Sequence, residues 1–288
     1  MDINNLVKYN ERMRKSLIDK IFFMDKVENV DTIIDFGCAD GTLLKFLAII
    51  FPEYNYIGYD NSKEMLSLAR DAAGKIKFTS NLKDIITHID LNRSILLLSS
   101  VIHEVYSYSS QEEIQQFWAE VFYSGFRYIA IRDMIPNRNI KRQASYMDLS
   151  KVYQPQRKEQ IDEFEHHWGS LSNNINLVHY LLKYRYTDNW NHEVAENYLP
   201  LIFEDLLYLI PDFYEIDFCE HYTLPYVKNI VREDFGIVLK DNTHAKLILQ
   251  KNSDGRSYPH STFRTAGAGL YRIMQDIFVC RVSYILNQ

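Results

Sequence analysis

The chain has 288 residues, a length that suits one large domain or two modest ones. Hydrophobic residues make up 47% and charged residues 24%, with only 10 Gly and 7 Pro, which excludes disordered and fibrous proteins. No apolar run approaches the roughly 20 residues that a membrane-spanning helix needs. The first 20 residues carry charges of both signs and lack the apolar core of a signal peptide. We therefore expect a cytoplasmic protein with no membrane partner.

Cysteine usage and net charge narrow the class further. Cys38, Cys219 and Cys280 lie far apart with no CxxC spacing, so we expect reduced thiols and no thiolate metal site. The formal charge of −6 gives no overall attraction to nucleic acid, although a local basic patch is still compatible with it.

Residues 31–134 alternate short apolar runs with helical stretches, as expected of βαβ units around a parallel sheet. The predicted strands are residues 32–36, 55–59, 75–79, 94–99 and 127–132, and the predicted helices are residues 41–51, 62–73 and 111–123. Ser110 with Glu113 has the spacing of a capping box at the start of the third helix, and Asn61 with Glu64 has a weaker version of it.

Outside residues 31–134, the predicted secondary structure is helical on both sides and returns to strands only near the C-terminus. A further helix is expected ahead of the first strand, where apolar residues recur at helical spacing between Leu6 and Met24. Residues 135–210 are mostly helical and rich in Tyr and His, as expected of an inserted cap. Strands are predicted again at 213–221 and 244–250, separated by a helix at 225–235, and the tail is helical from about residue 268.

The most informative motif is a turn rich in small residues, placed directly between a buried strand and a helix. Asp35 is followed by small residues at alternate positions, Gly37, Ala39 and Gly41. Such a turn lets a ligand approach the backbone closely, and the helix N-terminus behind it favours a negatively charged group. The spacing is not GxGxxG, which makes a bound pyrophosphate a poor match.

An acid follows at the distance typical of nucleotide-binding folds. Asp60 ends the second strand about 20 residues after the glycine turn, where a carboxylate can hold ribose hydroxyls. The two signals in series favour a nucleoside-containing ligand. The alternative is that both features are structural, a tight turn followed by a helix cap.

These residues resemble the first two motifs of the class I S-adenosylmethionine-dependent methyltransferases. The resemblance covers roughly residues 31–134, with Ala39 in place of the commoner middle glycine. It implies S-adenosylmethionine as the cofactor and a Rossmann-like sheet, mostly parallel with an antiparallel last strand, with helices on both faces. It assigns cofactor contacts to the following positions: Asp35, Gly37, Ala39, Gly41, Asp60, Asn61, Asn81 and Ser99.

The exit of the fourth strand resembles the family segment that faces the transferable methyl group. His103 and Glu104 are the nearest titratable residues and are our candidate catalytic pair, His103 as a proton acceptor. The alternative is that His103 packs under the cap and Glu104 binds a backbone group. We predict no metal site, because the adjacent His166 and His167 point about 100° apart on a helix and cannot readily share one ion.

The sequence thus predicts a methyltransferase of a small organic acceptor, methylated on oxygen or nitrogen. Residues 1–134 and 211–252 form the cofactor-binding core, residues 135–210 the substrate-selecting cap and residues 253–288 a tail helix. One alternative is RNA or nucleotide methylation, supported only by six basic residues between Arg138 and Lys158. Another is a non-catalytic cofactor-binding regulator. A homodimer through the apolar side of the tail helix, and packing of that helix on its own domain, are both compatible with the sequence.

Overall fold

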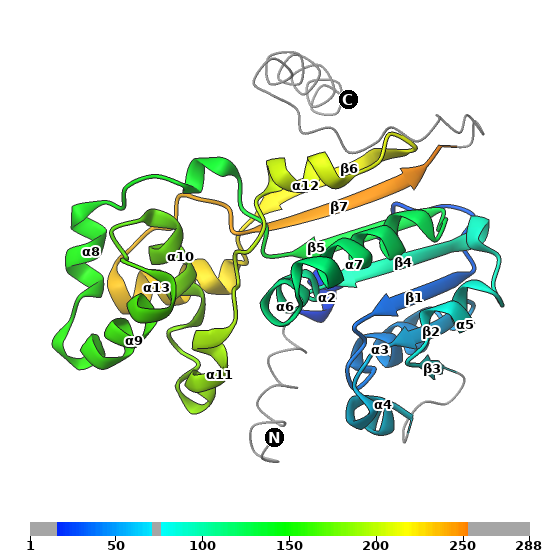
Figure 1. Ribbon diagram of the computed structural model, residues 1–288, viewed down its shortest axis with the longest axis horizontal. Coiled ribbons are helices and arrows are strands. Elements are labelled where there is room, and N and C mark those ends of the chain that lie inside the picture. The colour runs from blue at the N-terminus through cyan, green and yellow to red at the C-terminus, as the bar shows by residue number, and fades with distance from the viewer. Residues whose placement is uncertain (1–15, 71–75, 253–288) are drawn as a thin grey trace. The chain divides into compact units, whose positions relative to one another are not determined.

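A computed structural model describes residues 16–70 and 76–252 of the protein. Its centre is a seven-stranded sheet in the order β3-β2-β1-β4-β5-β7-β6 (Figure 1). The strands are β1 (Thr32–Phe36), β2 (Asn55–Tyr59), β3 (Lys77–Thr79), β4 (Ser94–Ser99), β5 (Tyr128–Asp133), β6 (Tyr214–Tyr222) and β7 (His244–Lys251). The first five strands run parallel, and β7 runs antiparallel to both of its neighbours, β5 and β6. The predicted Rossmann-like fold class, with its closing antiparallel pair, is confirmed.

Helices cover both faces of the sheet, because its strands carry apolar side chains on both faces. In β1, Ile33 and Ile34 are both almost fully buried, but they belong to different hydrophobic clusters. The same alternation occurs in β4, where Leu96 packs on one face and Leu97 on the other. Continuous apolar strands of this kind are typical of parallel sheets with helices on both sides.

The helices that cover the sheet include the four predicted ones. They also include helices at residues 82–86 and 102–108, which were not predicted, and one at residues 203–209, which was expected in the cap. They are α2 (Leu17–Lys20), α3 (Thr42–Ile50), α4 (Lys63–Arg70), α5 (Leu82–Ile86), α6 (Ile102–Tyr108), α7 (Gln111–Tyr123) and α12 (Phe203–Leu209), with a 3₁₀ turn η1 (Leu91–Arg93) before β4. The capping box at Ser110 and Glu113 is confirmed, with both reciprocal hydrogen bonds formed. At α4 the predicted cap at Asn61 is wrong: the Ser62 hydroxyl accepts the Met65 N–H instead, so the helix starts one residue later than expected.

The cap contains a second group of helices with its own apolar core. Its elements are η2 (Arg138–Ile140), α8 (Tyr146–Val152), η3 (Pro155–Arg157), α9 (Lys158–Trp168), α10 (Asn174–Lys183), η4 (Thr187–Asn189) and α11 (Trp190–Ala195). Helix α13 (Pro225–Phe235) comes after β6 in sequence, yet Figure 1 draws it among α8, α9 and α10. Val231 and Phe235 of α13 share one hydrophobic cluster with Leu177 and Tyr184 of the cap. The core of the cap therefore extends beyond residues 135–210, whereas α12 packs on the sheet.

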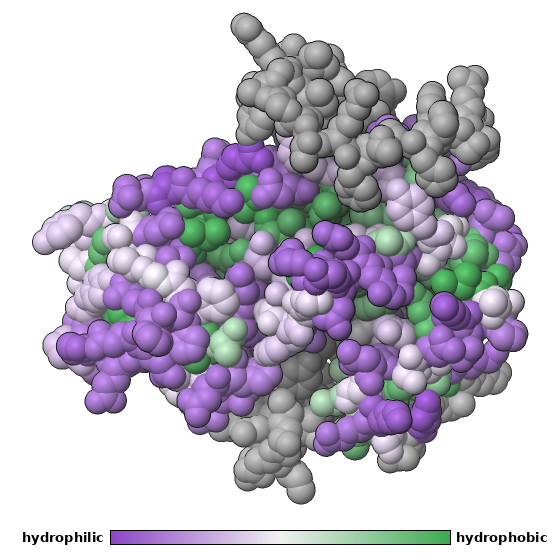
Figure 2. Space-filling model, in the orientation of Figure 1, coloured by the Kyte–Doolittle hydropathy of each residue, from purple (hydrophilic) through white to green (hydrophobic). Residues whose placement is uncertain are grey.

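Polar side chains cover most of the cap surface in the view of Figure 2, as expected of helices whose apolar sides form a core. Within residues 16–70 and 76–252, no helix combines the length and apolar character needed to cross a bilayer. Cys38 and Cys219, the cysteines in this part of the chain, are free thiols. The predicted tail helix and Cys280 lie outside the described residues, and so does the apolar side of that helix, for which a homodimer and packing on its own domain were both left open. Residues 6–15 of the helix expected between Leu6 and Met24 also lie outside them.

Candidate active site

Parallel strands bring the predicted site residues to one edge of the sheet. Phe36 in β1 is in register with Tyr59 in β2 and with Leu98 in β4. The residues that follow these three positions, Gly37, Asp60 and Ser99, therefore leave the sheet side by side. Ligands of open α/β sheets bind at this carboxyl edge.

The turn after β1 requires glycine at position 37. Gly37 has a φ of +76°, and a β-carbon there would lie 2.6 Å from Cγ2 of Val101. The N–H groups of Gly37 and Cys38 both donate to the carbonyl of Tyr59, which fixes the turn against the end of β2. Val101 immediately precedes α6, so this close packing also links the turn to the helix that carries His103.

Asp60 connects the turns that follow β1 and β2. Its Oδ2 accepts the N–H of Ala39 at 2.8 Å, and its Oδ1 accepts the N–H of Ser62 at 2.8 Å. Ala39 has a φ of +46°, and Gly41, the N-cap of α3, has a φ of +73°. The structural role that the sequence left open for Asp60 is thus real. Each carboxylate oxygen has a second lone pair, so the same group can also accept ribose hydroxyls.

Asp35 lies buried in β1 and interacts electrostatically with Lys20 of α2. Burial raises the pKa of Asp35, and the Lys20 ammonium opposes that shift. Burial also lowers the pKa of Lys20, as does the nearby Arg132. The burial of Lys20 could not be predicted from the sequence, because a single lysine in an amphipathic helix carries no sign of burial.

Ser99 offers a buried hydroxyl at the end of β4. Among the described residues, its Oγ has no hydrogen-bond partner. A buried hydroxyl without a partner is unfavourable, and a polar ligand at the carboxyl edge would supply one. Together with the tight glycine turn, this makes the edge suitable for a cofactor that carries polar groups.

The two predicted asparagine contacts are exposed. Asn61 directly follows Asp60. Asn81 caps α5: its Oδ1 accepts the N–H of Lys83 at 3.1 Å, and its Nδ2 donates to Asp84 at 2.9 Å. The main chain joins this region to Asp60, whose N–H donates to the Thr79 carbonyl. Asn81 therefore has a helix-capping role in addition to the contact predicted for it.

His103 is fixed by an acid that the sequence analysis did not select. Its Nδ1 lies 2.7 Å from Oδ1 of Asp133, at the end of β5, and Oδ2 of Asp133 accepts the N–H of Ile102. The pKa of Asp133 is lowered to about 2: burial opposes ionisation, but His103 and these hydrogen bonds outweigh it. An ionised carboxylate only accepts hydrogen bonds, so Nδ1 is the donor and Nε2 faces away from Asp133. The sequence did contain a sign of this residue, because Asp133 is an acid directly after the predicted fifth strand.

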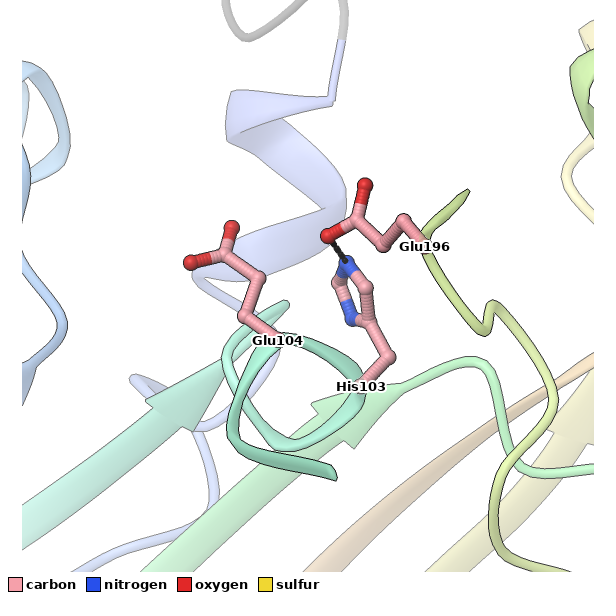
Figure 3. Close-up of side chains that lie close together, drawn as sticks. All are labelled: His103, Glu104 and Glu196. Carbon is pink, nitrogen blue, oxygen red and sulfur yellow. Dashed lines mark ion pairs between the residues drawn. The ribbon is translucent and has the colours of Figure 1, made fainter. Parts of the chain in front are cut away.

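Glu196 brings a second carboxylate to the imidazole from the cap. Its Oε1 lies 3.7 Å from Nε2 of His103 (Figure 3). Burial would lower the pKa of His103, but Asp133 and Glu196 raise it to about 9, so the ring is protonated near neutral pH. Burial raises the pKa of Glu196 itself to about 7.

Glu196 is held in place by a buried lysine. Lys183 of α10 is fully buried, and its Nζ donates to the carbonyls of Glu193 and Glu196, both at 2.5 Å. The Lys183 ammonium also lies 4.3 Å from the ring centroid of Tyr198. Burial lowers the pKa of Lys183 to about 7. No sequence pattern connects Glu196 to His103, because they lie on different elements 93 positions apart.

Glu104 stands next to His103 on the first turn of α6. One ligand atom from each of His103, Glu104 and Glu196 can be chosen so that all three lie within 4.8 Å of one another (Figure 3). The side chain is exposed, yet burial is the main cause of a raised pKa of its carboxyl.

The remaining candidates lie in the cap. His166 and His167 are exposed on α9. Five of the six basic residues between 138 and 158 make contacts within the chain: Arg138 with Asp205, Arg142 with Asp241, Lys151 with the Gly236 carbonyl, Arg157 with the rings of Tyr184 and Phe235, and Lys158 with Asp162.

Comparison with known proteins gives similar folds at low sequence identity. A SAM-dependent methyltransferase from Anabaena variabilis is 16% identical over 87% of this chain and 96% of that chain, with a TM-score of 0.47. One from Archaeoglobus fulgidus is 15% identical over 87% and 100%, with a TM-score of 0.45. The plantazolicin methyltransferase BpumL in complex with SAH is 11% identical over 86% and 90%, with a TM-score of 0.46. No protein-family model and no curated protein matches the chain. These values describe similar folds and assign neither a family nor an activity to this chain.

Proposed function

We propose that the protein is an S-adenosylmethionine-dependent methyltransferase that acts on oxygen or nitrogen of a small organic acceptor. The observation that carries the proposal is the alignment of Gly37, Asp60, Ser99 and the His103–Asp133 pair along the carboxyl ends of β1, β2, β4 and β5. Gly37, Asp60 and Ser99 suit a nucleoside cofactor. The His103–Asp133 pair provides titratable groups at the adjoining strand ends.

Each of these residues has its own role in binding the cofactor at the carboxyl edge of the sheet. The glycine turn admits the cofactor close to the backbone, Asp60 accepts its ribose hydroxyls, and Ser99 supplies a hydroxyl that needs a partner. The bound cofactor would supply a methyl group on a positively charged sulfur, which is already a good electrophile. The chain then has to orient the acceptor in line with that methyl group and exclude water.

His103 and Glu104 are the proposed catalytic residues. Glu104 can accept the proton of the acceptor, and the His103 ring, which is protonated near neutral pH, donates a hydrogen bond to the reacting atom. Glu196 reaches the same point from the cap, which fits a cap that covers the acceptor and selects it. The free thiols of Cys38 and Cys219 accord with the cytoplasmic location that we propose.

A small acceptor is favoured over RNA by the contacts of the basic stretch. A phosphate backbone needs cations that face solvent, but Arg142 binds Asp241 through both nitrogens and Arg157 lies over Tyr184 and Phe235. Weak and salt-independent retention of single-stranded RNA is the expected result. Tight, strongly salt-dependent binding would favour the RNA alternative.

The test of the proposed function is calorimetric titration with S-adenosylmethionine and S-adenosylhomocysteine, with NAD as the control ligand. Saturable binding of the first two and none of NAD is expected. Absence of binding in a folded sample free of carried-over ligand would contradict the proposal and favour a protein that keeps the fold without the cofactor. Binding without turnover on any acceptor would favour the regulator.

A further inference from the structure

The cluster formed by His103, Glu104 and Glu196 has the composition of a metal site. It contains one imidazole and two carboxylates, contributed by α6 and by the loop that follows α11. This donor set suits a divalent cation such as Mn²⁺ or Zn²⁺, because imidazole favours the softer and carboxylate the harder ions. No metal site was predicted from the sequence, where only His166 and His167 were considered as metal ligands. Glu196 is remote from His103 and Glu104 in sequence.

The geometry points to a shared ligand more than to a direct ion pair. The 3.7 Å between Nε2 of His103 and Oε1 of Glu196 exceeds hydrogen-bond length. Two atoms that each lie about 2.1 Å from one cation are separated by roughly 3 to 4 Å. Glu104 is exposed and can rotate to shorten the widest separation, which is within 4.8 Å.

The surroundings also match those of bound metals. Metal-binding histidines usually donate their second N–H to a carboxylate, which fixes the ring and its tautomer. Asp133 accepts the Nδ1 proton of His103 in this way, leaving Nε2 to face Glu196. On the other side, Lys183 Nζ donates to the main-chain carbonyls of Glu193 and Glu196, so the main chain at the cap ligand has a defined position.

We propose that a divalent cation displaces the Nε2 proton of His103 and is bound by this nitrogen and by the carboxylates of Glu104 and Glu196, between α6 and the cap. Three protein ligands leave coordination positions for an acceptor oxygen. If the proposed function holds, the cation binds an acceptor hydroxyl and makes it more acidic. Transfer then forms a carbon–oxygen bond and breaks the sulfur–carbon bond, while the hydroxyl proton leaves to solvent.

Binding is tested on the full chain, stripped with EDTA and titrated with Mn²⁺ by calorimetry and by the EPR signal of free Mn²⁺. We expect one Mn²⁺ per chain, and binding weaker by about tenfold or more in Glu104→Gln and in Glu196→Gln, because even residues that support metal ligands have effects of this size. Glu104→Gln is the principal variant, since an exposed side chain can be changed without loss of folding. Glu159→Gln, on the exposed side of α9, is the matched control and should bind as the wild type does.

Two results would overturn the site: no saturable binding of Mn²⁺ or Zn²⁺ to the folded chain, or equal binding by the wild type and both cluster variants. Failure of the proposed function is seen separately, because the S-adenosylmethionine titration is run on the same metal-free protein. Mn²⁺ binding without cofactor binding supports the site and contradicts the methyltransferase. Turnover that is insensitive to EDTA would overturn the role of the cation in the reaction.

Discussion

The Asp133 carboxylate holds the imidazole of His103 by a 2.7 Å hydrogen bond to Nδ1, and both side chains are buried. The same carboxylate accepts the N–H groups of Ile102 and Met134, so it ties the end of β5 to the start of α6. Removing one member of a buried charge pair leaves the other without compensation. We expect Asp133→Ala to lower the free energy of unfolding by about 3 to 5 kcal/mol, measured by urea denaturation. A loss below 1 kcal/mol would contradict this role.

Substitution of His103 should affect turnover more than it affects cofactor binding. The ring faces Asp133 and Glu196, whereas the glycine turn and Asp60 form the predicted cofactor side. His103→Gln should therefore reduce turnover at least tenfold with little change in the Kd for S-adenosylmethionine. Calorimetry and a turnover assay on the same preparation separate the two effects. A fall in stability that accounts for the whole loss of activity would indicate that His103 only packs beneath the cap.

Asp60 is expected to contribute to both the fold and cofactor binding. It accepts hydrogen bonds from Ala39 and Ser62, so Asp60→Ala should cost about 1 to 3 kcal/mol of stability in addition to weakening S-adenosylmethionine. Asp40→Ala is the matched control, because among residues 16–70 and 76–252 Asp40 Oδ1 accepts a single turn N–H, that of Thr42, and no ribose contact is predicted for it. Calorimetric Kd values should differ clearly between the two variants. Equal affinities would remove Asp60 from the cofactor site.

Ser99 gives a test in which stability and binding change in opposite directions. Its buried Oγ has no partner within the described residues, so Ser99→Ala should leave the stability of the ligand-free protein unchanged or raise it by up to about 1 kcal/mol. Affinity for S-adenosylmethionine should fall several-fold. Ser94→Ala is the control: Ser94 donates to the Leu91 carbonyl at 2.9 Å, and its loss should lower stability while leaving the affinity unchanged. Cofactor binding that is unaffected by Ser99→Ala would contradict the assignment.

The sequence was sufficient for the sheet and for the turns at its carboxyl edge. Apolar runs of five or six residues, a capping box at Ser110 and small residues at 37, 39 and 41 are local patterns, and each corresponds to a local structure. The contact between His103 and Glu196 could not be predicted, because it depends on how distant segments of the chain pack together. Glu196 meets His103 through the path of the cap, and α13 joins the cap core although it follows β6. Burial of Lys20 and Lys183 likewise depends on what packs around them.

Substitution of Gly37 is expected to lower stability in two ways, by backbone strain and by a steric clash, and the two contributions can be measured separately. A side chain at φ +76° is strained, and its β-carbon would also lie 2.6 Å from Val101. Gly236 has a φ of +62°, and within the described residues nothing lies within 4 Å of a β-carbon there. Gly236→Ala should therefore cost only the strain, about 1 to 2 kcal/mol, and Gly37→Ala should cost about 1 to 3 kcal/mol more. Equal losses in urea denaturation would show that the contact with Val101 is easily relieved.

The pH dependence of stability should contain a contribution from His244, which is buried at the start of β7. Burial, and then the charge of Arg132, lower its pKa from 6.5 to about 3 in the folded protein. The unfolded chain therefore binds a proton below pH 6.5 while the native chain does not, until the pH reaches about 3. The contribution is fully present above pH 6.5 and is lost as the pH falls, by up to about 1.4 kcal/mol per pH unit. Urea denaturation between pH 7 and 4.5 should show a shallower acid loss in His244→Gln than in the wild type. Parallel curves would mean that His244 takes up its proton in the folded state as readily as in the unfolded one.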